Sequence, residues 1–361
     1  MAYRYSQLEL LNVEVDLELA ERVCKMLKSY VDQTLRIFAE SHLFFILFCL
    51  VLPTQVNLVA IVVLSRGHCG LSTCTTRYMM AMAMGDLAFI VTDVILWKIV
   101  NDYYPWCFLY ITPVCRVINV LRHAATDCSV WFTVTFTIDR FVAICCPKLK
   151  TKYCTEKIVS VILATTSILL CLKNIPFYFP LESLEIIDNV PWFCIVKASY
   201  YSEPGWARYD WFSTILTPLL PFALILLLNA LTVRHILVAS RVRKGLRGQS
   251  KGENHSDPEM ESRRKSGILL FAISGSFILL WLVYVLHFLY NRIVGENSRN
   301  YNNAEITFQI VGDTLQHLSC CTNTFIYGAT QSRFREQLKS TVIYPMILKN
   351  VQLFDIKVIC D

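Results

Sequence analysis

Charged residues are scarce in this chain. Asp, Glu, Lys and Arg make up 17% of its 361 residues, whereas an ordinary soluble domain carries about 25%. Hydrophobic residues make up 55% of the sequence, and they are gathered in long blocks. This composition excludes an ordinary soluble domain and indicates a protein embedded in a lipid bilayer. The net charge of +6 requires no nucleic-acid partner, because a basic cytoplasmic side facing anionic lipid accounts for it.

The N-terminal segment also lacks a signal peptide. Residues 1–40 have no succession of basic start, apolar core and small-residue cleavage site, so membrane insertion has to rely on the first spanning segment. Residues 8–28 have the pattern of an amphipathic helix but contain no Asn-x-Ser/Thr acceptor. We expect residues 1–42 to be a poorly ordered extracellular extension; the alternatives are a misassigned start and a ligand-binding domain.

Seven apolar runs are long enough to cross a bilayer as helices, which takes about 20 residues each. They predict an all-α membrane protein, a seven-transmembrane helix bundle. The runs lie at about 43–65, 78–99, 111–138, 157–179, 211–238, 267–290 and 306–328. We assign residues 43–329 to the bundle, and residues 330–361 to a short amphipathic helix, QSRFREQLK, followed by a cytoplasmic tail.

Lys and Arg in the short loops set the orientation, because basic loops stay preferentially in the cytoplasm. The loops after the first, third and fifth runs are basic, whereas the opposite loops hold acids such as Glu182, Glu185 and Glu296. We therefore expect a multi-pass protein of the plasma membrane with its N-terminus outside and its C-terminus in the cytoplasm. The acceptor sequence Asn254-His255-Ser256 then lies inside and stays unglycosylated.

The third run is unusually polar for a membrane span. At 3.6 residues per turn, Cys115, Arg122, Ser129 and Arg140 fall within about 40° of one another around the helix axis. Arg122 and Arg140 lie about 27 Å apart along that axis, close to the thickness of the hydrocarbon core. Because lipid cannot solvate such a polar line, we expect this helix to lie inside the bundle.

Ionisable side chains deep in other spans mark candidate functional positions, since they are costly in a membrane and face the interior by default. The second run carries Asp86 and Asp93. Asp86 lies too deep to reach water and needs a partner; the alternative is a polar contact that only fixes helix packing. One side of the seventh run is too polar for lipid, with Asp313, Gln316, His317, Ser319, Asn323 and Tyr327.

Most of the 15 cysteines fall within spans or cytoplasmic loops, where thiols stay reduced. We place Cys24, Cys107, Cys115 and Cys194 on the oxidising side. A bridge from Cys115 to Cys194 would tie the long loop after the fourth run across the mouth of the bundle. Cys107 is the competing partner.

Landmarks on these runs resemble those of the rhodopsin-like (class A) G-protein-coupled receptors, over about residues 43–340. Each landmark alone is weak, but together they lie on the expected spans in the expected order. They are Asn57, Asp86, Cys115, Asp139-Arg140-Phe141 followed by Pro147, Pro221, Phe277 four residues before Trp281, and Asn323-Thr324-Phe325-Ile326-Tyr327. The stretches LSTCTTRYMMAMA and IDRFVAICCP are most similar to an orphan vertebrate branch whose better-known member is linked to aromatic amino acids and peptides.

The resemblance implies a receptor, not an enzyme, that converts extracellular binding of a small or peptide ligand into activation of a heterotrimeric G protein. It also favours the bridge between Cys115 and Cys194. It implies coupling to the G protein by Asp139, Arg140 and Phe141, and an activation relay through Val130, Pro221, Phe277, Trp281, Asn323 and Tyr327. The candidate ligands of an allosteric sodium ion are Asp86, Ser129, Ser319 and Asn323, and we expect no other cofactor.

A ligand cavity at the outer end is also implied, with walls from Arg122, His123, Trp211, Trp281, Tyr284, His287, Asp313 and His317. Arg122 stands where receptors for amines have an acidic residue, so a cationic amine is not the expected ligand. Arg122 pairs either with Asp313 or with a carboxylate of the ligand. His317 stands where visual pigments carry their retinal lysine, which excludes an opsin.

Four positions depart from the family pattern. Thr166 lies near the place of the usual fourth-span tryptophan, and Val283 replaces the sixth-span proline. Asn229 replaces a fifth-span tyrosine, and Thr324 replaces the seventh-span proline. Without its proline the sixth span needs another cause for a kink, so we include weak or altered coupling among the expectations.

A transporter or channel is the alternative function. It would show internal repeats, or helices broken by Gly or Pro at matching places in two halves, and the sequence has neither. An intramembrane protease is suggested by Gly85-Asp86 and Gly312-Asp313. However, Ala83 and Ile310 stand where the aspartyl type requires a further glycine.

Overall fold

A computed structural model describes residues 51–66, 71–104, 106–146, 148–149, 153–247, 258–294 and 303–343. All of them belong to one of the chain's two compact units, Cys49–Asp361. The predicted extension 1–42, residues 344–361 of the predicted tail, Pro147 and the Asn254-His255-Ser256 acceptor lie outside the described residues.

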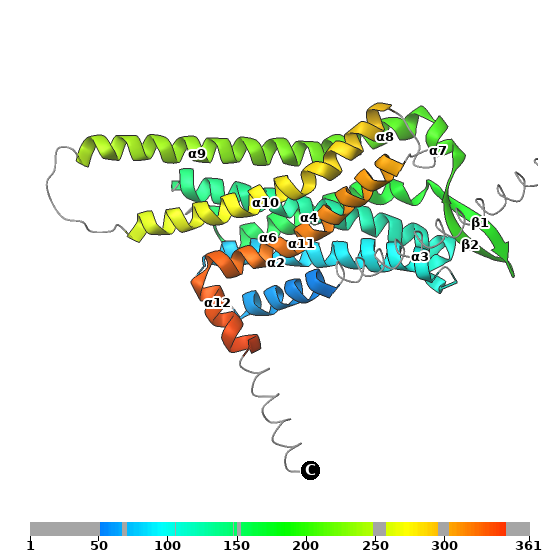
Figure 1. Cartoon of the computed structure of the whole chain (residues 1–361), viewed down its shortest axis with the longest axis horizontal. Helices are drawn as coiled ribbons and strands as arrows, with labels where there is room; N and C mark the ends of the chain where they lie inside the picture. Colours follow the sequence, from blue (N-terminus) through cyan, green and yellow to red (C-terminus); the bar gives the residue numbers. More distant parts are fainter. Residues whose placement is uncertain are drawn as a thin grey trace, which may run out of the picture. The chain divides into compact units, whose positions relative to one another are not determined.

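Each of the seven predicted spans coincides with helix in the described part of the chain (Figure 1). The first span is the helix Val51–Ser65. The others are α2 (Thr73–Phe89) with η1 (Ile90–Ile99), α4 (Thr112–Cys145), α6 (Glu156–Asn174) with η3 (Ile175–Tyr178), α8 (Pro204–Thr214) with η4 (Ile215–Leu219) and α9 (Leu220–Arg247), α10 (Pro258–Val294), and α11 (Asn303–Thr330).

Five of these helical segments are long and apolar enough to cross a membrane by themselves. They are Thr73–Ile99, Thr112–Cys145, Glu156–Tyr178, Pro204–Ala239 and Ser266–Tyr290. The helix Val51–Ser65 is shorter within the described residues. α11 carries Asp313, Gln316 and His317, and such a helix needs neighbours that cover its polar side.

α4 lies at the centre of the packing, in contact with α2, α6, α9 and α10. The predicted polar line points inward, since Cys115, Ser129 and Arg140 are all buried. The opposite side of α4 exposes apolar side chains, among them Val117 at 49% and Leu121 at 46%. α4 is therefore polar toward its neighbours and apolar toward its surroundings, as a membrane helix requires.

A two-stranded antiparallel hairpin, β1 (Leu181–Ile187) and β2 (Val190–Val196), lies beside the start of α4. Its two turn residues, Asp188 and Asn189, have φ angles of 49° and 61°, which suits a tight hairpin turn. The structure contains the bridge between Cys115 and Cys194, and Cys107, the competing partner, is a free thiol. The bridge fixes β2 to the first turns of α4.

The two ends of α4 define the two ends of the bundle. The Cys115 end is the one where α4 begins and where the hairpin lies, together with α3 (Val100–Tyr103), η2 (Phe108–Tyr110) and α7 (Ala198–Ser202). The Arg140 end is the one where α4 ends. At the Arg140 end the chain turns after α11 into α12 (Ser332–Leu338) and η6 (Lys339–Ile343) (Figure 1). Phe334 of α12 is buried at 1% exposure, as its amphipathic pattern predicts.

Two apolar clusters fill the described bundle. One packs Tyr78, Met82, Phe136, Tyr327 and Phe334. The other packs side chains from α4, α9 and α10, namely Val130, Val134, Phe222, Ile225, Phe277, Trp281 and Val285. The second cluster contains three of the predicted relay residues, and it lies between the two ends of α4.

Candidate functional site

A cavity of about 680 Å³ lies at the Cys115 end, a size typical of sites for small ligands. Its walls come from α2, η1, α4, η3, α7, α8, η4, α10 and α11. Seven of the eight predicted cavity residues line it: Arg122, His123, Trp211, Trp281, Tyr284, His287 and Asp313. The eighth, His317, is buried behind Phe89, with the two rings stacked 5.3 Å apart.

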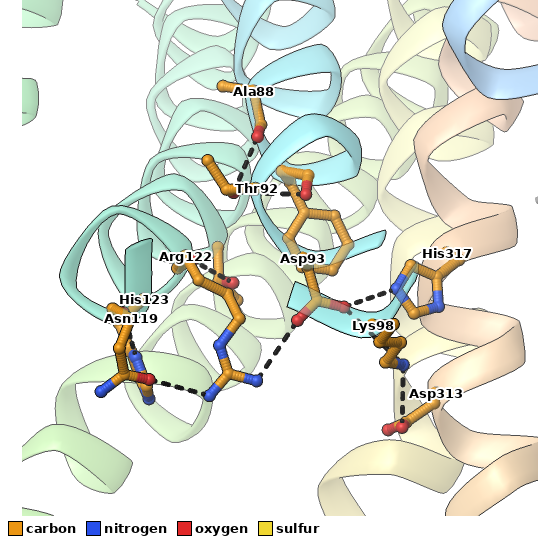
Figure 2. A network of polar contacts seen from close by, with 11 residues as sticks. Ala88, Thr92, Asp93, Lys98, Asn119, Arg122, His123, Asp313 and His317 are labelled. Carbon is orange, nitrogen blue, oxygen red and sulfur yellow. Dashed lines mark hydrogen bonds and ion pairs between the residues drawn. The ribbon is translucent and has the colours of Figure 1, made fainter. Parts of the chain in front are cut away.

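Charged side chains from three helices meet on one wall of this cavity (Figure 2). Asp93 is at the centre, with Oδ1 3.4 Å from Arg122 Nη1 and Oδ2 2.8 Å from His317 Nε2. Lys98 Nζ lies 3.1 Å from Asp313 Oδ2 and 3.7 Å from Asp93 Oδ2. We call Asp93, Lys98, Arg122, Asp313 and His317 the ion network. It links η1 to α4 and α11.

The guanidinium of Arg122 is only partly satisfied. Nη2 donates to Asn119 Oδ1 at 3.2 Å, and the group lies over the Trp97 ring at 4.5 Å. Its Nε is buried and has no hydrogen-bond partner among the described residues. Of the two alternatives for Arg122, the pair with Asp313 does not form, because Asp93 pairs with Arg122 and Lys98 pairs with Asp313.

A second buried ion pair joins α4 to α6 near the same cavity. Lys173 Nζ lies 2.7 Å from Asp127 Oδ2, and Asn174 Nδ2 donates to the same oxygen at 2.6 Å. Asp127 also lines the cavity. His123, one turn earlier, donates from Nδ1 to Asn119 O at 2.8 Å and stacks on Phe177 with ring centres 4.0 Å apart. This wall is therefore held by polar contacts between α4 and α6 and by ring stacking on η3.

An aromatic series runs from the cavity into the bundle. Tyr284 contacts Trp281 (5.8 Å between ring centres), Trp281 contacts Phe277 (5.2 Å), and Phe277 contacts Phe222 (5.6 Å). Trp281 Nε1 donates to Ser319 Oγ at 2.9 Å, which ties α10 to α11. Pro221, the neighbour of Phe222, is buried. Movement of Trp281 in the cavity floor would thus press on both α9 and α11.

Asp86 lies below this series with two of the predicted sodium ligands beside it. Ser129 Oγ donates to Asp86 Oδ1 at 2.5 Å, and Asn323 Nδ2 donates to Oδ2 at 2.9 Å. Ser319 is turned elsewhere, since its hydroxyl donates to Gln316 O at 2.7 Å. Asn57, another landmark, donates to Cys320 O at 2.8 Å and so connects the first span to α11.

At the Arg140 end, the Arg140 guanidinium is held beside its neighbour. Nε donates to Asp139 Oδ2 at 2.9 Å, and Nη2 contacts the same carboxylate. Nη1 donates to Ser266 Oγ of α10 at 3.3 Å. Phe141 is half-buried, and Tyr327 is fully buried with its hydroxyl 3.9 Å from Met82 Sδ. Arg140 therefore links α4 to α10 in this conformation.

Residues 56–327 match the family described as 7 transmembrane receptor (rhodopsin family). The chain belongs to this family. The match runs from within the first helix to within α11, and it confirms the resemblance that the landmarks indicate. The family is one of signalling receptors that act through G proteins, so the chain is a G-protein-coupled receptor, and nothing favours the transporter alternative.

Individual relatives are distant and differ in the ligands that their names indicate. The receptor is 25% identical to C-C chemokine receptor type 3 of Cavia porcellus over 78% of this chain and 73% of the relative. It is 26% identical to G-protein coupled receptor 182 of Homo sapiens over 80% and 66%. It is 25% identical to trace amine-associated receptor 13c of Danio rerio over 78% and 80%. Similarity to the orphan branch stays a prediction.

The departures from the family pattern have visible structural counterparts. Asn229 Nδ2 donates to Ser274 Oγ at 2.7 Å, so this position links α9 to α10. With Val283 in place of proline, α10 is a continuous α-helix from Pro258 to Val294. Thr324 is buried, and its hydroxyl has no hydrogen-bond partner among the described residues. Thr166 is half-buried, and nothing in the structure explains the absence of tryptophan there.

Sequence reasoning missed two lysines of this receptor. Lys98 and Lys173 each stand near the end of an apolar run, where a lysine is ordinarily expected to extend toward water. Both instead turn inward to carboxylates, Lys98 to Asp313 and Lys173 to Asp127. The available signal was the set of acids in neighbouring spans, because each buried carboxylate requires a cation or a proton.

Proposed function

We propose that the cavity at the Cys115 end binds a small molecule or peptide that carries a carboxylate, and that binding activates a heterotrimeric G protein at the Arg140 end. The position of Arg122 is the observation that supports a carboxylate as the ligand's charged group. This guanidinium lines the cavity, its contact to Asp93 is long at 3.4 Å, and its buried Nε has no partner among the described residues. A carboxylate accepts two N–H bonds from such a group.

Transmission through the bundle would follow the aromatic series. A ligand in the cavity touches Trp281 and Tyr284, which line it. Displacing Trp281 strains its bond to Ser319 and its packing on Phe277. Since packed clusters change between discrete arrangements rather than deform continuously, a small shift here favours an outward position of α10 and releases Arg140 from Ser266. Val130, Pro221, Asn323 and Tyr327 complete the proposed relay, with Asp139 and Phe141 flanking Arg140 at the G-protein contact.

The proposed orientation puts the Cys115 end outside the cell, with the receptor in the plasma membrane. The basic residues of the loops at the Arg140 end support it. In this arrangement residues 1–42 form an extracellular extension, residues 43–329 the receptor domain, and residues 330–361 the cytoplasmic helix and tail.

A sodium ion is proposed as an allosteric ligand near Asp86. The Asp86 carboxylate and the Ser129 hydroxyl meet there, and such oxygen groups suit a small hard cation. Asn323 presents its amide nitrogen to Asp86, so it would have to turn its amide to offer an oxygen to the ion. Ser319 fits less well because it is bonded to Gln316 and Trp281. A bound sodium ion would supply the positive charge that the buried carboxylate lacks. We expect Asp86→Asn to abolish any sodium dependence of ligand affinity in a radioligand assay; an unchanged dependence would exclude this site.

The ligand class is tested with pairs of carboxylates and their primary amides, screened on cells that report several G proteins. We expect responses to acids and not to the matching amides. Arg122→Gln should lower the potency of an active acid by about 10- to 100-fold, the worth of a charge-assisted bidentate contact. Arg116→Gln is the matched control on the same helix, because Arg116 donates to Leu181 O and does not line the cavity. Equal potency of acid and amide would exclude the carboxylate.

The coupling site is tested separately with Arg140→Ala. We expect loss of ligand-stimulated nucleotide exchange with ligand binding and surface expression retained, since Arg140 lies at the end opposite the cavity. Arg333→Ala is the control, because Arg333 is an exposed base of α12 that pairs with Glu336. If Arg140→Ala signalled normally, the proposed coupling mechanism would be wrong.

A further inference from the structure

We propose that Lys98 is a built-in cation: its ammonium fills an amine subsite between Asp93 and Asp313 and thereby keeps cationic amines out of the cavity. Lys98 would then be a specificity-determining residue of the receptor. The inference rests on the proposed role of this cavity as the ligand site, and it says which ligands that site rejects.

The geometry is that of an occupied amine site. Lys98 Nζ lies 3.1 Å from Asp313 Oδ2 on α11 and 3.7 Å from Asp93 Oδ2 on η1 (Figure 2). An ammonium has three N–H donors and no acceptor, so a pair of carboxylates from two helices is the surrounding that a free primary amine would also require. Lys98, Asp93 and Asp313 all line the cavity, so a ligand atom can reach the same place.

The charges around the subsite make Lys98 indispensable to one carboxylate. Asp93 also has Arg122 and His317 beside it. For Asp313, Lys98 is the one cation that forms an ion pair within the described part of the chain. Removing the Lys98 ammonium therefore leaves Asp313 uncompensated on the cavity wall. The two side chains are 27% and 28% exposed, so the loss of the ammonium destabilises the protein less than in a fully buried pair, and an incoming ammonium restores the lost contact.

The same geometry argues against Lys98 as the site for a ligand's carboxylate. An anion approaching the ammonium would meet Asp93 and Asp313 on either side of it, and like charges at this distance repel. Arg122 lines the cavity with one acid, Asp93, beside it, whereas Lys98 is flanked by two acids. An anion is therefore better placed at Arg122, and Lys98 occupies the place of a cation.

The test uses purified full-length receptor in detergent, with melting temperature as the readout and n-propylammonium chloride as the probe. For Lys98→Met we expect a lower melting temperature than wild type, and a rise of about 2 to 4 °C at amine concentrations near ten times the dissociation constant. Wild type should not respond. n-Propanol, the neutral isostere, and sodium chloride at equal ionic strength should not raise the melting temperature of either protein.

Two further variants identify the carboxylate. Lys98→Arg keeps a cation in the subsite, so it should not respond to the amine. The double variant Lys98→Met with Asp313→Asn removes the acid that the amine would bind, so the gain should disappear. If Lys98→Met does not fold, Lys98→Gln takes its place; if neither folds, propylammonium in the growth medium should restore the yield of folded receptor, and no restoration contradicts the proposal.

A folded Lys98→Met protein that ignores propylammonium overturns the proposal, as does a wild-type receptor that responds equally. The assay needs neither a G protein nor the natural ligand. A negative result in this assay therefore excludes the role of Lys98 without affecting the tests on Arg122 and Arg140. Negative results in those two tests likewise leave the role of Lys98 standing.

Discussion

Asp127 and Lys173 face each other at 2.7 Å with side chains only 7% and 8% exposed. So little solvent contact means that each charge depends on the other and on Asn174, whose amide donates to the same carboxylate oxygen at 2.6 Å. The pair differs in kind from Arg77 and Glu156, which also form an ion pair but are 45% and 53% exposed. The first pair is structural, whereas the second is screened by water.

Replacing Lys173 by Met should lower the free energy of unfolding by about 3 kcal/mol, because it leaves the Asp127 carboxylate buried with one amide as its partner. Melting temperature in detergent measures this. Arg77→Met, at the exposed pair, should cost about 1 kcal/mol or less. Adding Asp127→Asn to Lys173→Met should recover part of the loss, since the unpaired charge is then gone. A single variant as stable as wild type would contradict the structural role.

At this scale the sequence predicts which residues are polar inside the bundle but not how they pair. Cys115, Arg122, Ser129 and Arg140 follow from helical spacing alone, and the structure places them on the inner side of α4 or on the cavity wall. The partner of Arg122 was not predictable, because the choice between Asp93 and Asp313 depends on where Lys98 points. A side chain with four flexible bonds has no preferred direction that sequence can reveal.

At the scale of elements, α10 is a continuous helix of 37 residues from Pro258 to Val294, although family members normally carry a proline at the position of Val283. A proline there removes one helical hydrogen bond and bends the helix, and neighbouring helices in a membrane bundle tolerate the change. α10 packs along α11 and carries both Trp281, in the cavity floor, and Ser266, beside Arg140.

We expect Val283→Pro to bend α10 and to increase basal nucleotide exchange. A shift of about 1 kcal/mol toward the outward position of α10 changes the ratio of the two states about fivefold. Val283→Ala is the control, because alanine keeps the backbone N–H. Nucleotide exchange is measured for both variants on reconstituted receptor with a purified G protein. Equal basal rates would show that the absence of proline at position 283 does not limit activation.

The spans themselves were predictable because long apolar runs have few alternatives in a bilayer. The ends of the helices were less predictable than the spans. α9 continues to Arg247 and α10 begins at Pro258, well beyond the apolar runs, because Lys, Arg and Glu are good helix formers outside lipid. The β1–β2 hairpin was not predicted. Its strands expose Leu184 and Ile186 at 57% and 72%, so their pattern does not show the alternation of a strand with one buried face.

At the scale of the whole molecule, the proposed orientation puts the hairpin turn outside the cell. Pro191→Thr converts Asn189-Val190-Pro191 into a glycosylation acceptor at an exposed turn, and we expect a glycan there. Digestion with an endoglycosidase and a mobility shift on a gel detect it. The added change Asn189→Gln should remove the shift, and the natural Asn254-His255-Ser256 sequence should carry no glycan. A glycan at Asn254 and none at Asn189 would show that the orientation is the opposite of the one proposed.

The link between Arg140 and Ser266 has a consequence for how such a receptor behaves without any ligand. Within the described residues, this 3.3 Å bond to an uncharged hydroxyl is the polar side-chain contact that Arg140 makes with α10. A hydrogen bond with a charged partner contributes about 1.5 to 3 kcal/mol at ordinary length, and this one is long at 3.3 Å, so the contact between α4 and α10 is weak and thermal motion opens it often. We expect measurable constitutive signalling, and compounds that lower this baseline should be found as readily as compounds that raise it.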